Sequence, residues 1–155
     1  LADEYTQFFE EFEFKNDVKI KIIGEKQGLP FNIYNILSSI EKKTKENKKL
    51  NLNIAFNYGT NKELLSIINN IIAIHKNKKI IIDDALLQEH MYLSNIPDPD
   101  LLIRTGGFQR LSNFLLLKLS YTELFFTKTL WPDLNEKELL KIFENYKNIE
   151  RNYGL

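Results

Sequence analysis

The chain contains no cysteine among its 155 residues. Disulfide bonds, thiolate metal sites and a cysteine nucleophile are therefore excluded within it. An excess of charge is also missing, because 21 basic residues balance 21 acidic ones. A nucleic-acid-binding protein usually carries a clear basic excess, so the composition disfavours nucleic acid as a partner.

Long apolar runs are scarce as well, since none approaches the roughly 20 residues that a membrane-spanning helix needs. No signal peptide is visible, although the first residue is Leu1 and any segment before it would not be seen. The phosphate-loop pattern G-x-x-x-x-G-K and the dinucleotide pattern G-x-G-x-x-G are both absent. The two histidines, His75 and His90, lack metal-ligand spacing, and the pair Asp83 and Asp84 is typical of a helix cap.

Apolar residues make up 43% of the chain and charged residues 27%, which is ordinary for one globular domain with a usable core. The apolar pattern predicts strands over 18–23, 50–56, 101–104 and 124–126, and helices over 1–14, 32–47, 61–75, 84–92, 112–119 and 135–153. This order predicts an α/β fold with a mostly parallel sheet covered by helices on both faces. Ligands of such folds bind beyond the carboxyl ends of the strands.

Residues 98–131 contain the pattern with the most chemical content. A predicted strand ends at Arg104, two glycines follow, and then come Arg110 and Ser112 at a predicted helix start. Guanidinium groups, glycine-loop amides and a helix N-terminus all attract anions. The pattern therefore predicts phosphate or diphosphate recognition, and the alternative is two surface arginines beside a helix cap.

The same region is similar to the C-terminal signature of the cis-prenyltransferases, the undecaprenyl diphosphate synthase family. Four linked blocks within about forty residues carry the resemblance, namely 103–107 (IRTGG), 109–114 (QRLSNF), 123–126 (ELFF) and 130–133 (LWPD). Residues 57–59 (NYG) look like a further block, and the resemblance extends loosely over nearly the whole chain.

The resemblance implies an enzyme that condenses isopentenyl diphosphate with an allylic diphosphate, usually farnesyl diphosphate, to make a long-chain cis-polyprenyl diphosphate. It implies that Arg104, Arg110 and Ser112 hold the diphosphate of isopentenyl diphosphate, with Leu111 contributing through its backbone. It also implies that Glu123 helps to bind Mg²⁺. The alternative for Glu123 is a surface carboxylate or a structural ion pair.

One expected block is missing. The family opens with an Asp-Gly-Asn-Gly-Arg segment whose aspartate is essential, and that segment does not occur here. The resemblance thus implies that residues 1–155 are the C-terminal part of a single catalytic domain, with no catalytic residue in this chain and the essential aspartate upstream. The alternatives are a non-catalytic partner subunit of a two-component prenyltransferase and a generic phosphate-binding or nucleotide-binding α/β domain.

Single positions depart from the family as well. Phe108 stands where a glutamate is usual, and Leu117 and Lys118 stand where a tryptophan and a glutamine are usual. Asn152 replaces an arginine that reaches a diphosphate, although Arg151 beside it could substitute.

Family precedent also implies a homodimer. The apolar segments 112–119 and 124–126 would form the contact between the two copies, with Phe108 at or near it. Because the product is a lipid, we expect the protein in the cytoplasm or peripherally on a membrane surface, with the location in a eukaryote left open.

Overall fold

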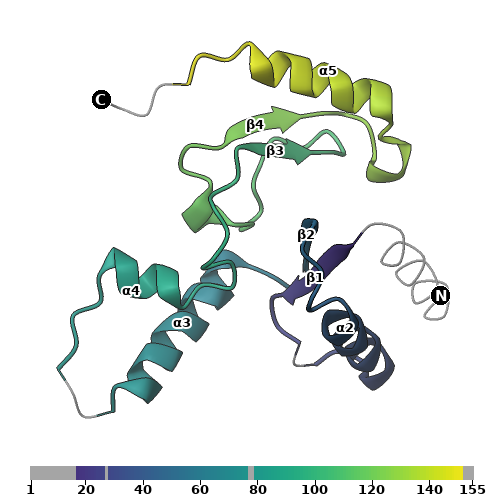
Figure 1. The fold of residues 1–155 in the computed structure, drawn as a ribbon. Helices are drawn as coiled ribbons and strands as arrows, with labels where there is room; N and C mark the ends of the chain where they lie inside the picture. The colour runs from purple at the N-terminus through teal and green to yellow at the C-terminus, as the bar shows by residue number, and fades with distance from the viewer. Residues whose placement is uncertain (1–16, 27, 77–78, 152–155) are drawn as a thin grey trace. The chain divides into compact units, whose positions relative to one another are not determined.

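The computed structural model describes residues 17–26, 28–76 and 79–151, so the helix expected over 1–14 lies outside the described residues. The chain divides into two compact units, Leu1–Ile80 and Ile81–Leu155. Strands alternate with helices along the chain and pair in parallel, which confirms the predicted α/β class (Figure 1). No helix within the described ranges is long and apolar enough to cross a membrane.

The first unit is built on a pair of parallel strands. Strand β1 (Val18–Ile23) pairs with β2 (Leu50–Ala55). β1 matches its predicted range and β2 ends one residue early. β1 ends at Gly24, whose φ is +106° and where a Cβ would lie only 2.2 Å from the Phe56 carbonyl oxygen. Glycine is therefore required at this position.

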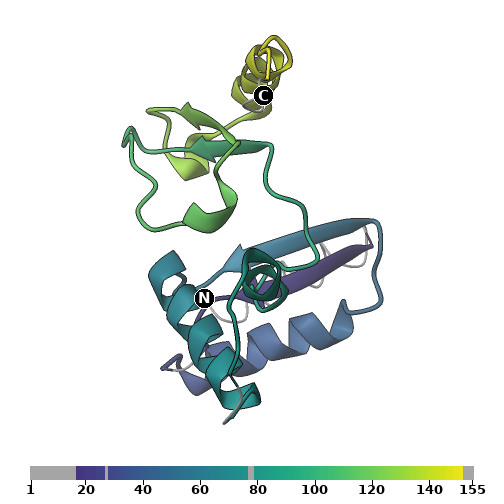
Figure 2. The same ribbon diagram turned by 90° about the vertical axis from the view of Figure 1, so that its left-hand side faces the viewer.

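Helix α2 (Phe31–Lys43) packs along β1, and helix α3 (Thr60–Ile74) follows β2, close to their predicted ranges. Both views show α2 running beside the strand pair (Figures 1 and 2). Burying each aliphatic side chain between α2 and β1 stabilises the fold by roughly 1.5–3 kcal/mol. The buried members of this core are Val18, Ile20, Ile22, Leu37 and Ile40.

Within the described residues, side chains and not another strand bond to the outer edge of β1. The Ile22 amide donates to Glu41 Oε1 at 2.8 Å, and the Ile20 amide donates to Thr44 Oγ1 at 3.0 Å. The fully buried Thr44 hydroxyl donates in turn to the Ile40 carbonyl at 2.9 Å. These bonds satisfy backbone groups that an unpaired strand edge would leave open.

The second unit holds strands β3 (Leu101–Arg104) and β4 (Glu123–Phe126), which pair in parallel. Helix α4 (Asp84–Glu89) precedes them, and the Asp83 carboxylate caps it by accepting from the Leu86 amide at 2.9 Å, as predicted. Helix α5 (Glu136–Lys147) lies alongside β4 in both views (Figures 1 and 2). It begins after its cap, Asn135, the first residue of the predicted range, but ends well before residue 153.

The helix predicted over 112–119 is wrong. Ser112, Asn113 and Leu115 have φ angles of 49°, 62° and 48°, which a right-handed helix cannot contain. Only a short 3-10 turn, Leu116–Lys118, forms within the segment. The segment is therefore an irregular loop, although its apolar residues have the spacing of a helix.

A buried cation fixes the end of that loop. The Lys118 ammonium donates to Asp98 Oδ1 at 2.6 Å and to the Ile96 carbonyl at 3.1 Å. Asp98 is thus an ion-pair partner that holds the end of the loop. Trp131, which precedes α5, is 76% exposed and therefore does not anchor that helix to the described core.

We expect Thr44→Val to lower the free energy of unfolding by about 2 kcal/mol, because the buried Ile20 amide loses its acceptor. Thr44→Ser keeps the hydroxyl and is the matched control, with an expected loss of about 1 kcal/mol or less for one methyl group. Urea unfolding with an unchanged m-value measures both. Equal losses in the two variants would contradict the role given to the hydroxyl.

Candidate functional site

A pocket of about 360 Å³ opens at the carboxyl end of β3. The residues predicted to bind an anion all contribute to its wall. The lining consists of Leu102, Ile103, Arg104, Thr105, Arg110, Leu111, Ser112 and Phe114. The structure therefore brings together the four residues that the sequence singled out, at the sheet edge where α/β folds bind ligands.

Arg104 joins the two sides of this pocket. Its Nη1 donates to Ser112 Oγ at 3.0 Å and also to the carbonyl oxygen of Arg110. The Arg110 guanidinium lies over the Phe108 ring, with its Cζ 4.1 Å from the ring centroid. No carboxylate in the described part of the chain pairs with either guanidinium. The two positive charges remain available to a ligand.

The glycine loop contributes differently from the prediction. Gly106 and Gly107 have φ angles of 84° and 79°, and their amides donate to the carbonyls of Thr129 and Thr127, both at 2.8 Å. These bonds prolong the contact between the two strands, so the expectation that the glycine amides face an anion is wrong. No helix begins at Ser112, so the expected helix-terminus charge is missing as well. The groups in the pocket that would attract an anion are the two guanidinium groups and the Ser112 hydroxyl.

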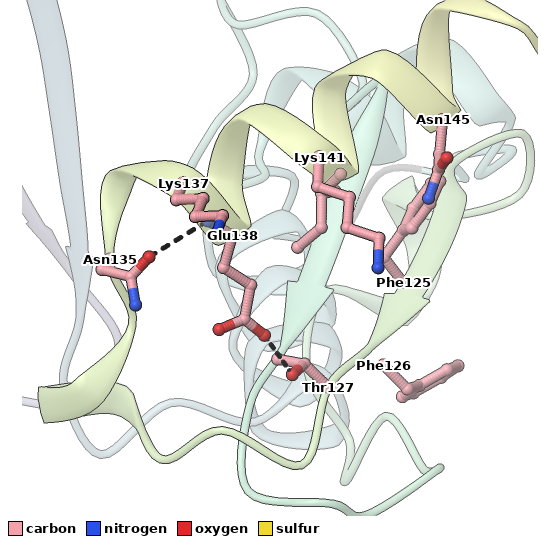
Figure 3. A pocket seen from close by; sticks show the side chains of 9 residues that line it. Phe125, Phe126, Thr127, Asn135, Lys137, Glu138, Lys141 and Asn145 are labelled. Atoms are coloured by element: carbon pink, nitrogen blue, oxygen red, sulfur yellow. Dashed lines mark hydrogen bonds between the residues drawn. The ribbon is translucent and has the colours of Figure 1, made fainter.

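A second network, which the sequence reasoning missed, holds the partners of those glycines. The Glu138 carboxylate on α5 accepts from the Thr127 hydroxyl and, at 2.8 Å, from the Thr129 hydroxyl. Figure 3 shows Glu138 directed from α5 toward Thr127, beside a pocket of about 460 Å³. The spacing of Asn135 and Glu138 fits a capping box and was the available signal, but the Glu138 side chain reaches to the segment after β4 instead of its own helix start.

The hydrogen bond from Thr127 is the main reason that the pKa of Glu138 lies below its ordinary value. The bond from Thr129 and the charge of Lys141 act in the same direction, while partial burial opposes them. The ionised carboxylate is therefore the form that fits this network.

Glu123 lies at the other end of the strand pair. Leu101 is opposite Glu123 in the ladder, whereas Arg104 is opposite Phe126. Three residues of strand separate these positions, which is ~10 Å. The Glu123 carboxylate makes no hydrogen bond or ion pair within the described part of the chain. No group of three or more acidic or histidine side chains there could hold a metal, so magnesium binding by Glu123 stays a prediction.

Arg151 is also held away from the anion pocket. Its Nη1 donates to Asp100 Oδ1 at 2.7 Å and to the Tyr146 hydroxyl at 2.9 Å, and its Nη2 donates to the Tyr121 carbonyl at 3.3 Å. Asp100 immediately precedes β3, so this cluster lies at the opposite end of the strand from Arg104. Arg151 thus ties the segment after α5 to the start of β3, and Asn152 lies outside the described residues.

Comparison with protein families matches residues 1–154 to the family described as putative undecaprenyl diphosphate synthase. An isoprenyl transferase of Thermotoga maritima is 40% identical over 158 residues, covering 99% of this chain and 68% of the relative. A chloroplastic nerylneryl diphosphate synthase of Solanum lycopersicum is 41% identical over 156 residues, covering 99% of this chain and 49% of the relative. Most of the curated relatives are matched over less than two thirds of their length.

Two solved structures are similar to this chain. A probable undecaprenyl diphosphate synthase from Campylobacter jejuni has a TM-score of 0.85 and 31% identity, covering 99% of this chain and 71% of that one. A lavandulyl diphosphate synthase from Lavandula x intermedia, solved in complex with dimethylallyl diphosphate, has a TM-score of 0.88 and 31% identity. That match covers 99% of this chain and 70% of the other.

We expect Glu138→Gln to destabilise the second unit at neutral pH but not in acid. A carboxyl whose folded pKa is lowered stabilises the fold above its unfolded pKa of about 4.3, and this contribution is lost as pH falls through the folded pKa. Glu136→Gln, an exposed change in the same helical turn, is the matched control. Urea unfolding at pH 7 and pH 3 measures the difference.

If Glu138→Gln and Glu136→Gln behave alike at both pH values, the Glu138 network does not stabilise the unit.

Proposed function

Because the chain belongs to the undecaprenyl diphosphate synthase family, we propose that it is the C-terminal part of the catalytic domain of a cis-prenyltransferase. The proposed reaction condenses isopentenyl diphosphate with an allylic diphosphate, with farnesyl diphosphate as the expected one, to make a long-chain cis-polyprenyl diphosphate. The observation that carries this proposal is the pocket after β3, where two guanidinium groups that no described carboxylate pairs with meet the Ser112 hydroxyl.

In this proposal Arg104 and Arg110 bind the diphosphate of isopentenyl diphosphate. A guanidinium can donate two parallel hydrogen bonds to phosphate oxygens, and each charge-assisted bond stabilises binding by roughly 1.5–3 kcal/mol. Ser112 adds a hydroxyl donor and Leu111 a backbone amide. Holding the substrate in one orientation lowers the entropy cost of its reaction with the allylic partner.

Magnesium would neutralise the leaving diphosphate. Glu123 offers a half-buried carboxylate with no partner in the described part of the chain, and such a hard oxygen suits Mg²⁺. One carboxylate is not a complete site, but Mg²⁺ commonly takes one or two carboxylates and fills its other positions with water and substrate oxygens. We therefore keep Glu123 as the proposed protein ligand.

We also propose a homodimer. Large apolar side chains remain exposed on the loop after the anion pocket and on β4, where the predicted contact lies, and a two-fold pairing would cover them. These side chains are Phe114, Leu116, Leu117, Leu124 and Phe126. A lipid product further suggests a location in the cytoplasm or at a membrane surface.

The alternative is a non-catalytic partner subunit. Phe108 in place of the usual glutamate favours it, whereas the assembled group of Arg104, Arg110 and Ser112 favours an active enzyme. Incorporation of labelled isopentenyl diphosphate by the full-length protein alone tests the choice. Activity that appears only after addition of a second, different subunit would support the partner role.

We expect Arg104→Ala and Arg110→Ala in the full-length protein to raise KM for isopentenyl diphosphate by about tenfold or more, from the loss of a charge-assisted contact. KM for the allylic substrate should change much less. Lys137→Ala, the loss of an exposed cation on α5, is the control and should change neither. Steady-state kinetics with each substrate varied in turn gives the comparison, and equal weakening of both substrates would contradict the assignment.

Glu123→Gln should lower the rate and raise the Mg²⁺ concentration needed for its half-maximal value, because the amide is a poorer ligand for a hard cation. Glu136→Gln removes the same charge from an exposed position on α5 and is the control. A magnesium titration identical to that of the unaltered protein would leave Glu123 as an ordinary half-buried acid.

A further inference from the structure

The Phe108 ring lies within cation–π range of both cations of the anion pocket. The Arg110 Cζ lies 4.1 Å from its centroid and the Arg104 Cζ lies 6.0 Å from it. A guanidinium within about 6 Å of an aromatic face is attracted to the negative charge of that face, by roughly 0.5–1 kcal/mol at an exposed site. Because the ring is 52% exposed, this weak exposed-site energy is the one expected here.

This arrangement differs from that of the ion-paired cations in the same unit. Lys118 pairs with Asp98, and Arg151 pairs with Asp100. Arg104 and Arg110 face an aromatic ring instead and have no carboxylate partner within the described residues. An aromatic ring orients a cation without cancelling its charge, whereas a carboxylate would neutralise one guanidinium and compete with an incoming phosphate.

Phe108 is not among the residues that line the pocket, whereas both arginines are. Its backbone follows Gly107, whose amide is held by the Thr127 carbonyl at 2.8 Å. The ring is thus carried by a backbone that is tied to the segment after β4, and it acts on a ligand only through the guanidinium groups.

We propose that Phe108 is a positioning residue that holds Arg104 and Arg110 as an uncompensated pair of cations, so that their pocket selects diphosphate esters over monophosphate esters. This inference rests on the proposed function of the pocket. Two neighbouring guanidinium groups repel each other, and attraction to one shared ring offsets part of that repulsion. A diphosphate spans both cations, whereas a monophosphate has fewer negative charges to pair with them.

The test measures binding of isopentenyl diphosphate and isopentenyl monophosphate to the full-length protein by calorimetry without Mg²⁺. We expect Phe108→Leu, which keeps an apolar side chain but removes the ring, to weaken diphosphate binding about two- to fivefold and monophosphate binding less. Phe108→Tyr keeps the ring and should bind like the unaltered protein. Phe143→Leu, a change of an exposed phenylalanine on α5, is the control and should have no effect.

Steady-state kinetics of turnover distinguish a positioning role from a general loss of structure. Phe108→Leu should raise KM for isopentenyl diphosphate with kcat unchanged, and Phe108→Tyr should restore KM. Sedimentation of each variant distinguishes this role from a contact between two copies. If both variants change the oligomeric state and lose binding together, Phe108 acts at such a contact and the inference is wrong.

The failure of this inference and that of the proposed function can be told apart. If Arg104→Ala weakens binding of isopentenyl diphosphate but Phe108→Leu does not, the positioning role is wrong and the pocket keeps its function. Equal weakening of monophosphate and diphosphate by Phe108→Leu overturns the selection between them. If Arg104→Ala binds isopentenyl diphosphate as tightly as the unaltered protein, the proposed function of the pocket fails and the inference fails with it.

Discussion

The hydrogen bonds from the amides of Gly106 and Gly107 to the carbonyls of Thr129 and Thr127 are the constraint on which the anion pocket depends. They prolong the pairing of β3 and β4 past the end of the strands, and only left-handed backbone at the two glycines allows this path. The hydroxyl groups of the same two threonines donate to Glu138 on α5. A helix, a strand end and a glycine loop therefore form one connected framework, from which the pocket side chains project.

The distribution of charge partners separates structural cations from candidate functional ones. Lys118 and Arg151 are satisfied by carboxylates and carbonyls, and each ties a loop to the start of β3. Among the residues that the structure describes, Arg104 donates to a hydroxyl and a carbonyl alone, and Arg110 lies against an aromatic ring. An anionic ligand is the partner that would complete both guanidinium groups. The left-handed backbone at Ser112 fits this view, because such strain often accompanies a binding site.

Local patterns in the sequence predict the fold well where one interaction decides the structure. Alternation predicts β1, and the side-chain oxygens of Asp83 and Asn135 predict two helix starts. The pattern fails over 112–119. Apolar spacing contains no information about the ion pair that Lys118 forms with Asp98, twenty residues away, or about the left-handed residues of this loop. The meeting of Arg104, Arg110, Leu111 and Ser112 around one pocket could be predicted, since they lie close together in the sequence, while anion binding by them stays a prediction. The role of Glu138 could not be predicted, because it depends on how α5 lies against β4.

The central claim is that Arg104 and Arg110, and not Arg151, receive the diphosphate. NMR of the arginine side-chain Nε–Hε groups during a titration of the full-length protein with isopentenyl diphosphate tests this claim directly, and these are the three arginines of the chain. The account predicts that the signals of Arg104 and Arg110 shift together with one dissociation constant while that of Arg151 stays in place. A shift of Arg151 without shifts of the other two would contradict it.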